Sequence, residues 1–367
     1  MNNASALSDW ISRPGDSLLA AMQRRGVTTT ALAIRLTGGM DQLRDIVSGI
    51  QPIDPESAQA ISEAVGGSAH FWMKRQANYD RDLARAVLST SPVDQEVWLR
   101  SIPAPGPRPR GRLSEETRII ELKRRLEFYG VGTLGAWRGR YISELQATRF
   151  RTSQTLTSDD GAISLWLRKG ELAASLAETA PWRADALESK LGAIRRLSRI
   201  SRPRRFLPKV KGLLAEAGVA LVVMRAPKGC RASGASRLVR PDRAMIMLSF
   251  RFRSDEQFWF TLFHEIGHLI LHGDRSFVDE DVTSGNTFEN EANDFAASLV
   301  IPPEKEQEFA ELKIKHQFIT RFAVSAEVAP GLVLGQLQHR GRVARNRLNS
   351  LKRTWPWDEI DQAISTL

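Results

Sequence analysis

The sequence predicts a mainly α-helical protein with one small α+β region towards its C-terminal end. Apolar residues recur at helical spacing through much of residues 14–200, as at Leu165 and Leu172. Two short apolar runs, residues 219–224 and 244–249, have instead the length and composition of buried strands. With 367 residues, of which 42% are hydrophobic and 26% charged, the chain is typical of a globular protein of two or three domains. This composition excludes the disordered and fibrous classes.

Residues 14–66 are expected to form several short helices separated by tight turns. The pattern predicts helices at about residues 28–36 and 40–47, separated by the glycine pair Gly38–Gly39, and a further helix that Asp54 caps. Two short helices about a glycine turn form a helix-turn-helix, in which the second helix can enter the major groove of DNA.

Further residues fit this pattern: Pro14–Gly15, residues 25–28, Leu32–Ala33, residues 46–49 and 52–55, Phe71–Trp72 and residues 77–79. With them, roughly residues 13–85 resemble the XRE-type helix-turn-helix proteins, and among these the HigA-like antitoxins. The candidate DNA contacts are Thr28, Thr29, Met40, Gln42 and Arg44.

Two carboxylates, Asp41 and Asp45, lie in the candidate recognition helix, and carboxylates repel phosphate groups. Residues 1–100 hold 10 basic and 11 acidic residues, so this region lacks the basic surface typical of DNA-binding domains. Two interpretations therefore stay open, namely sequence-specific DNA binding and a module for dimerisation or partner docking.

The net charge of +10 comes from the middle of the chain. Residues 101–211 hold 23 basic and 11 acidic residues, whereas residues 1–100 and 212–367 each have a net charge of −1. Residues 101–112, which are rich in proline, glycine and arginine, and the proline- and arginine-containing residues 201–209 are expected to interrupt regular structure at the two boundaries. The predicted domains are residues 1–100, a basic helical connector at 101–211, and a C-terminal domain at 212–367.

Residues 258–273 (FWFTLFHEIGHLILHG) hold the most informative motif of the chain. On a helix, His264 and His268 stand one turn apart on the same face, so both imidazoles can bind one metal ion. Glu265 lies about 100° round the helix, where it can reach a metal-bound water without becoming a ligand. The motif therefore predicts a metal site with a general base beside it.

A catalytic zinc site needs a third protein ligand. A histidine six residues after His268 would supply it in one class of enzymes, but this position is Asp274. A glutamate on a following helix is the other solution, and Glu289 fits it, with Asn293 one turn further on to hold a neighbouring ligand. Glu291 is the alternative ligand. His272 extends the histidine face, where it either polarises a substrate carbonyl or packs at the helix end.

About residues 210–353 closely resemble the ImmA/IrrE family of metallo-endopeptidases. The resemblance is carried by the histidines and glutamates named above and by Ala292, Phe295–Ala297 and Ile301–Pro302, which follow them. The resemblance implies a mainly α protein with a small α+β zincin-like metallopeptidase domain, preceded by the helix-turn-helix bundle and the helical connector. It also implies that a backbone edge near residues 234–236 holds the substrate as an added strand. Members of the family act on repressors and on stress-response regulators that are often encoded beside them.

The predicted function is that of a zinc-dependent, gluzincin-like endopeptidase. Zn²⁺ held by His264, His268 and Glu289 would activate water and polarise the scissile carbonyl, while Glu265 would transfer the proton. The expected partner is a protein substrate, namely a co-encoded repressor or antitoxin. Binding to DNA and formation of a homodimer are left as open possibilities. The alternative is a DNA-binding regulator or antitoxin whose zinc domain acts as a sensor or is idle.

The expected location is the cytoplasm. The single cysteine, Cys230, cannot form an intramolecular disulfide, and the first residues lack the order of a secretion signal. Apolar runs also fall short of the roughly 20 residues that span a bilayer, so no membrane association is expected.

Overall fold

The computed structural model describes residues 11–106, 109, 111–142, 159–273, 277–279 and 287–367. Its backbone contacts divide these residues into two compact units. The first holds the described residues up to 142 together with 159–178, and the second holds those from 179 to 367. The segment expected as one connector, residues 101–211, is therefore distributed over both units.

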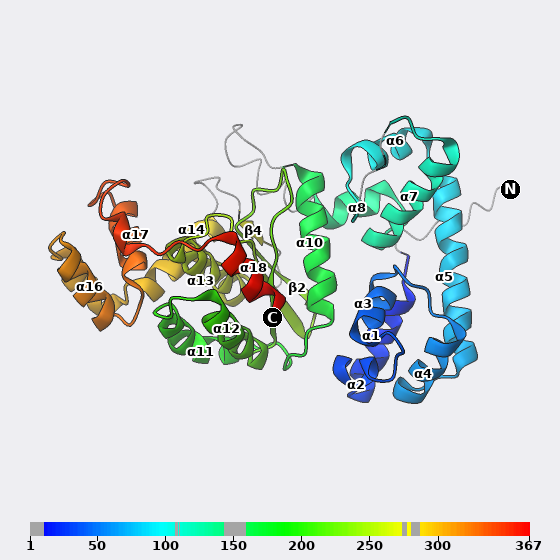
Figure 1. Ribbon diagram of the computed structural model, residues 1–367, viewed down its shortest axis with the longest axis horizontal. Helices are drawn as coiled ribbons and strands as arrows, with labels where there is room; N and C mark the ends of the chain where they lie inside the picture. Colours follow the sequence, from blue (N-terminus) through cyan, green and yellow to red (C-terminus); the bar gives the residue numbers. More distant parts are fainter. Residues whose placement is uncertain (1–10, 107–108, 110, 143–158, 274–276, 280–286) are drawn as a thin grey trace. The chain divides into compact units, whose positions relative to one another are not determined.

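The elements of regular structure in the first unit are all helices within its described residues (Figure 1). Its helices are α1 (Pro14–Arg25), α2 (Thr29–Ala33), α3 (Gly39–Ser48), α4 (Pro55–Val65), α5 (Ala69–Ser89), α6 (Pro92–Ser101), α7 (Glu115–Tyr129), α8 (Leu134–Tyr141) and α10 (Asp160–Ser175). One apolar core joins α1 to α5 through buried side chains such as Leu18, Leu43 and Trp72.

Local capping explains several helix starts in this unit. Asp54 accepts a hydrogen bond from Ser57 N at 2.8 Å, and Pro55 occupies the first position of α4, as the sequence predicts. Thr28 caps α2 by accepting from Ala31 N at 3.1 Å. Helix α2 ends at Ala33, three residues before the predicted end, because the next residues form tighter turns, in which Arg35 N donates to Leu32 O at 3.0 Å and Leu36 N to Ala33 O at 3.1 Å.

Buried ion pairs use part of the positive charge of this unit. The carboxylate of Glu171 accepts from Arg168 Nη1 at 2.9 Å, from Arg140 Nη2 at 2.8 Å and from the Tyr141 hydroxyl at 3.1 Å. Arg125 similarly bonds to Glu121 at 2.6 Å. Because Arg125 and Arg168 are only 4% and 2% exposed, these arginines hold the fold together and are not presented to an acidic partner.

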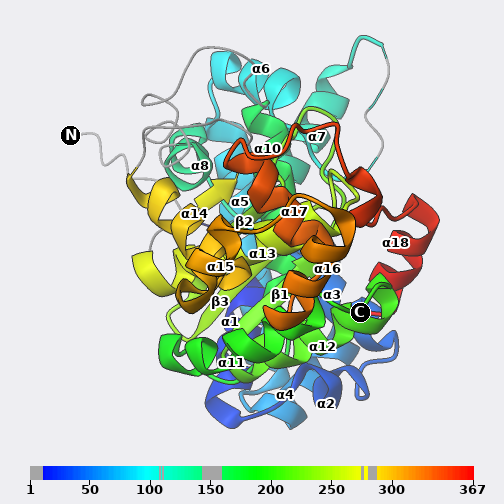
Figure 2. The same ribbon diagram turned by 90° about the vertical axis from the view of Figure 1, so that its left-hand side faces the viewer.

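The second unit places helices around one small sheet (Figures 1 and 2). Its helices are α11 (Ala184–Leu197), α12 (Pro203–Glu216), α13 (Asp255–His272), α14 (Thr287–Val300), α15 (Glu306–Ala310), α16 (His316–Ser325), α17 (Pro330–His339) and α18 (Trp357–Ser365), with short 3-10 turns at Pro303–Lys305 and Asn349–Leu351. Helix α13 packs between the sheet, α14 and α17. The chain is thus mainly helical with a small α+β region, which confirms the predicted fold class at this level.

The sheet has the strand order β1-β3-β2-β4. Its strands are β1 (Val219–Val223), β2 (Gly234–Arg240), β3 (Arg243–Leu248) and β4 (Phe277–Asp279). Strand β1 runs parallel to β3, and β2 runs antiparallel to both β3 and β4. Because Gly234, Ala235 and Ser236 pair on both sides, the prediction that their backbone offers an open edge for a substrate was wrong.

The proline-rich segment at residues 201–209 was expected to interrupt regular structure, and this prediction was also wrong. Helix α12 begins at Pro203, whose missing N–H would have no partner in a first helical turn in any case. Pro208 lies inside the same helix. The buried side chains of Phe206, Leu207 and Val210 pack into the core of the unit, and this packing stabilises the helix.

Within the described part of the chain, no single helix is long and apolar enough to cross a bilayer. Helices α16 and α17 reach that length and composition only when taken together, as a pair bent by 111°.

Candidate metal centre

Helix α13 carries His264, Glu265 and His268 in its buried middle. An apolar face that includes Leu262, Ile266 and Leu269 packs the helix into the core. The two imidazoles and the carboxylate are 3%, 1% and 0% exposed, respectively. Polar groups buried to this extent destabilise a fold unless they have partners or bind a ligand. Their placement is therefore typical of a functional site.

Glu289 of α14 completes a group that could hold a metal ion. The Nε2 atoms of His264 and His268 lie 2.9 Å apart. Glu289 Oε2 lies 3.2 Å from His264 Nε2, and Oε1 lies 3.5 Å from His268 Nε2. The three candidate donor atoms all lie within 4.8 Å of one another. Two imidazoles and one carboxylate from two helices match the ligand types of a catalytic zinc site that keeps a position open.

The protonation states of this group also suit a metal. Burial lowers the pKa of His268 to about 4, against the opposing effect of Glu289. Burial raises the pKa of Glu289, but the hydrogen bonds and charges of His264 and His268 outweigh it and lower that pKa to about 2. At neutral pH the His268 imidazole is therefore neutral and the carboxylate ionised, as metal binding requires.

Asn293 of α14 orients His264. Its Oδ1 lies 3.0 Å from His264 Nδ1. Because an amide oxygen only accepts hydrogen bonds, Nδ1 carries the hydrogen, and the lone pair of the imidazole is on Nε2, which faces His268 and Glu289. The sequence predicts this role for Asn293 from its spacing to Glu289, and the contact is consistent with it.

His272 and Glu291 extend the contacts of His268 away from this group. His272 Nδ1 lies 3.0 Å from His268 Nδ1, and His272 Nε2 lies 2.9 Å from Glu291 Oε2. Of the two glutamates weighed as the third ligand, Glu289 lies beside both candidate imidazoles, whereas Glu291 contacts His272. The described geometry thus connects His272 to His268 and Glu291, and the ring of Phe288 packs edge-on against the His272 imidazole.

Strand β2 approaches α13 closely at Glu265. A Cβ atom at Gly234 would lie 2.5 Å from Glu265 Oε1 and 2.6 Å from Thr261 Cγ2, both too short for real contacts. A methyl group at this position would therefore displace the side chain of Glu265 or of Thr261, whereas glycine allows the strand to pass the carboxylate closely. This contact was missed in the sequence analysis, although the unusual glycine at the start of a strand is a signal for close backbone approach.

The segment that holds this site is similar to one known protein family. Residues 218–330 match the peptidase M78 family, described as the IrrE N-terminal-like domain. The matched segment includes His264, Glu265, His268 and Glu289, and it supports a metallopeptidase-like role for this region. A search of curated proteins finds no match to the chain.

The candidate DNA contacts lie in the first unit, and most are engaged within it. Thr28 caps α2, and the Thr29 hydroxyl donates to Glu178 Oε1 at 2.9 Å. Gln42 accepts from Gly38 N at 2.9 Å, and Arg44 pairs with Asp41 at 2.6 Å. Met40 is 36% exposed. DNA binding by these residues stays a prediction.

Proposed function

We propose that this protein is a zinc-dependent endopeptidase whose metal ligands are His264, His268 and Glu289. The observation that carries the proposal is the convergence of these three side chains from two helices, with donor atoms within 4.8 Å of one another. Helix α13 supplies both imidazoles and also holds Glu265, and α14 supplies Glu289. When bound there, zinc supplies a Lewis acid for the scissile carbonyl and lowers the pKa of water to about 7.

Glu265 acts as the general base and acid in this proposal. Its position next to His264 on α13 keeps its carboxylate beside the metal group but outside the ligand set. It accepts a proton from the attacking water and delivers it to the leaving amine, a role that typically contributes about 10²- to 10⁴-fold to the rate. The backbone of Gly234 leaves the space that this carboxylate needs.

Asn293, His272 and Glu291 are proposed to hold the two imidazoles in place. When Nε2 of His268 faces the metal, its Nδ1–H donates to His272 Nδ1, and His272 Nε2–H donates to Glu291. Such partners fix the tautomer and the orientation of a ligand. His272 is therefore a positioning residue in this proposal, rather than a group that polarises the substrate.

Zinc titration tests the ligand set directly. Wild-type protein is expected to bind one zinc ion, and His264→Ala or Glu289→Gln should each weaken binding by more than about 100-fold, beyond the loss expected for an outer partner. Glu304→Gln, which changes an exposed glutamate of the same unit, is the matched control and should bind normally. Wild-type affinity in both ligand variants would contradict the proposal.

The proposed substrate is a regulatory protein, either a repressor or an antitoxin, that is encoded beside this chain. The proposed site of action is the cytoplasm. The family resemblance supports this choice. The test is to incubate zinc-loaded protein with the products of neighbouring genes and to follow cleavage by mass spectrometry. Cleavage of a regulator is expected, whereas intact regulators throughout would contradict the choice of substrate but not the metal site.

A second candidate is a DNA-binding regulator whose zinc domain is a sensor. It is supported by α2 and α3, two short helices that contact each other across the turn at Gly38. A gel-shift titration at several salt concentrations tests this candidate, because a sequence-selective shift should weaken steeply with salt. If no selective shift occurs at any salt concentration, a docking role for this unit is the better interpretation.

A further inference from the structure

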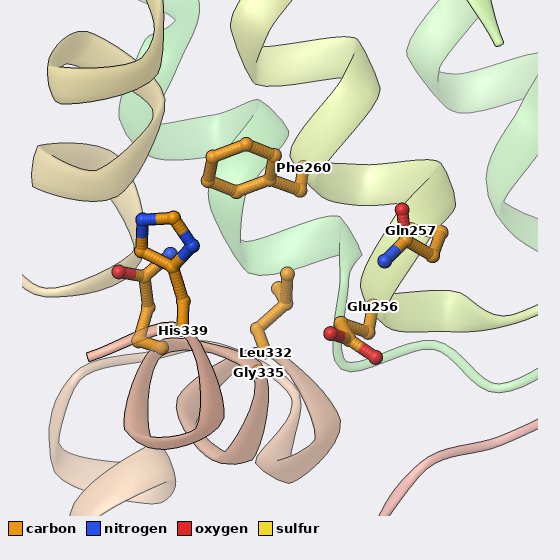
Figure 3. Close-up of a pocket in the computed structure, with 7 residues that line it drawn as sticks. Glu256, Gln257, Phe260, Leu332, Gly335 and His339 are labelled. Carbon is orange, nitrogen blue, oxygen red and sulfur yellow. The ribbon is translucent and has the colours of Figure 1, made fainter. Parts of the chain in front are cut away.

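A cavity of about 170 Å³ lies between the N-terminal half of α13 and helix α17. Figure 3 shows Glu256, Gln257 and Phe260 of α13 facing Leu332, Gly335 and His339 of α17 across it. Phe260 and Leu332 are its large apolar side chains. The cavity lies within the second unit, which also holds the candidate metal centre.

This cavity lies on the same face of α13 as the metal group. At about 100° per residue, Gln257 and Phe260 point within about 40° of His264. Phe260 is one turn before His264, about 6 Å along the helix axis, and Gln257 is about 10 Å before it. A polypeptide that runs from the metal group along α13 towards its N-terminal half would carry a neighbouring side chain past this cavity.

Polar side chains also line the cavity, and the one carboxylate among them already has a partner; they are Glu256, Gln257, Gln336 and His339. The Glu256 carboxylate forms an ion pair with the Lys352 ammonium, and both side chains are largely buried. Lys352 also donates to Gln338 Oε1 at 2.6 Å, which holds the pair in place. Because Lys352 balances the charge of Glu256, a charged group entering the cavity would lose its water without gaining an unpaired partner.

The size of the cavity depends on a glycine of α17. A Cβ atom at Gly335 would lie 2.6 Å from Glu256 Oε1, so the two helices approach closely at this end. The remaining volume slightly exceeds that of an apolar cavity of about 150 Å³ that binds benzene. A leucine, methionine or phenylalanine side chain therefore fits.

We propose that this cavity binds an apolar side chain of the substrate, of leucine to phenylalanine size, next to the scissile bond. The inference rests on the proposed endopeptidase function. It assigns to Phe260 and Leu332 the selection of the substrate residue, and it predicts that charged residues are disfavoured at that position.

Hydroxamates test this proposal without a known substrate, because they bind zinc directly. Three probes carry a methyl, an isobutyl or a benzyl group on the carbon next to the hydroxamate. Affinity is measured by calorimetry on the zinc-loaded full-length chain. The isobutyl and benzyl probes should bind about 10- to 100-fold more tightly than the methyl probe, as burial of such groups implies.

Two substitutions of the half-buried Phe260 connect this preference to the cavity. Phe260→Trp narrows the cavity and should remove most of the preference for the benzyl probe, and Phe260→Ala removes an apolar wall and should reduce the preference for the isobutyl probe. In each variant the measured quantity is the ratio of the affinity of a larger probe to that of the methyl probe, so that a uniform change in hydroxamate binding cancels. Val324→Ala, at a 56% exposed position of α16, is the control and should behave as wild type.

The outcomes separate this proposal from the one it rests on. If the methyl probe binds but the larger groups do not increase the affinity, the cavity is not a substrate site. The same conclusion follows if neither Phe260 variant alters the preference. In both cases the proposed metal centre is still supported. If no probe binds to the zinc-loaded chain, the metal centre fails and the role of the cavity fails with it. Circular dichroism of each variant verifies that it is folded.

Discussion

The backbone of Gly234 in β2 lies directly against the carboxylate of Glu265 in α13, so that a Cβ atom at residue 234 would lie 2.5 Å from Glu265 Oε1. The two residues are 31 positions apart in the sequence. The sheet therefore sets the position of the proposed general base, and it does so through a residue that has no side chain.

Gly234→Ala is accordingly expected to impair catalysis while sparing metal binding. The added methyl group displaces the Glu265 carboxylate, and a displacement of about 1 Å in an active site can lower the rate by about 100-fold. The measurement is the rate of substrate cleavage together with zinc affinity. Gly212→Ala, in α12, is the matched control because nothing lies within 4 Å of its added Cβ. Full activity of Gly234→Ala would show that the contact does not position Glu265.

Glu291→Gln tests the connection from Glu291 through His272 to His268. The carboxamide replaces a charged acceptor that lies 2.9 Å from His272 Nε2, so the orientation of His268 is less firmly held. Zinc affinity should fall by about 10- to 100-fold, as for outer partners of zinc ligands elsewhere. Competition with a chromophoric chelator measures it, and Glu304→Gln serves as the control. An unchanged affinity would show that Glu291 is only a surface group.

Glu171→Gln should destabilise the first unit. Arg168 is 2% exposed and bonds to Glu171 at 2.9 Å, so the substitution leaves a buried guanidinium without its anion. Breaking a buried ion pair in this way costs about 3–5 kcal/mol of unfolding free energy. The measurement is urea denaturation of the full chain. Asp41→Asn, which breaks an exposed pair with Arg44, should cost less than about 1 kcal/mol. Equal effects of the two variants would contradict this interpretation.

Asp255 makes the stability of the second unit depend on pH. Burial raises the pKa of this carboxyl to about 6, although hydrogen bonds from the backbone N–H groups of Arg353 and Glu256 oppose the shift. The folded chain thus binds this proton more tightly than the unfolded chain, whose pKa is 3.8. The contribution of Asp255 to stability is therefore present at pH 4 and is lost as the pH rises through 6.

Asp255→Asn removes this pH dependence and keeps an oxygen for both backbone donors. Relative to wild type, the variant should gain about 2 kcal/mol of stability between pH 4 and pH 7.5, from about 1.36 kcal/mol per unit of pKa. Denaturation at a series of pH values measures the difference. If the difference between the two proteins does not vary with pH, or if the variant loses stability as the pH rises, Asp255 is not the responsible group.

Features that depend on local sequence could be predicted. The cap at Asp54 and the helix that carries His264 and His268 follow from residue types and spacing within one or two turns. The proximity of Glu289 and Asn293 to these histidines followed from the pairing of two helical motifs. In the first two cases the signal lies in a few neighbouring residues, and in the third it lies in the set of ligands that a zinc site requires.

Features that depend on distant contacts could not be predicted. Strand β2 contains Arg237 and Arg240 and lacks the apolar pattern of β1, so only its pairing with β3 and β4 makes it a strand. The contact of Glu178 with Thr29 joins residues 149 positions apart. The cavity beside Phe260 likewise requires α17 to pack on α13, which no local pattern indicates.

The most direct test of the proposed endopeptidase is the substitution Glu265→Gln, measured for zinc content and for cleavage of the neighbouring regulator in the same preparation. The variant should hold one zinc ion per chain with wild-type affinity, and cleavage should fall by at least about 100-fold, because the carboxamide cannot accept the proton. Undiminished cleavage by a zinc-loaded Glu265→Gln protein would contradict the account.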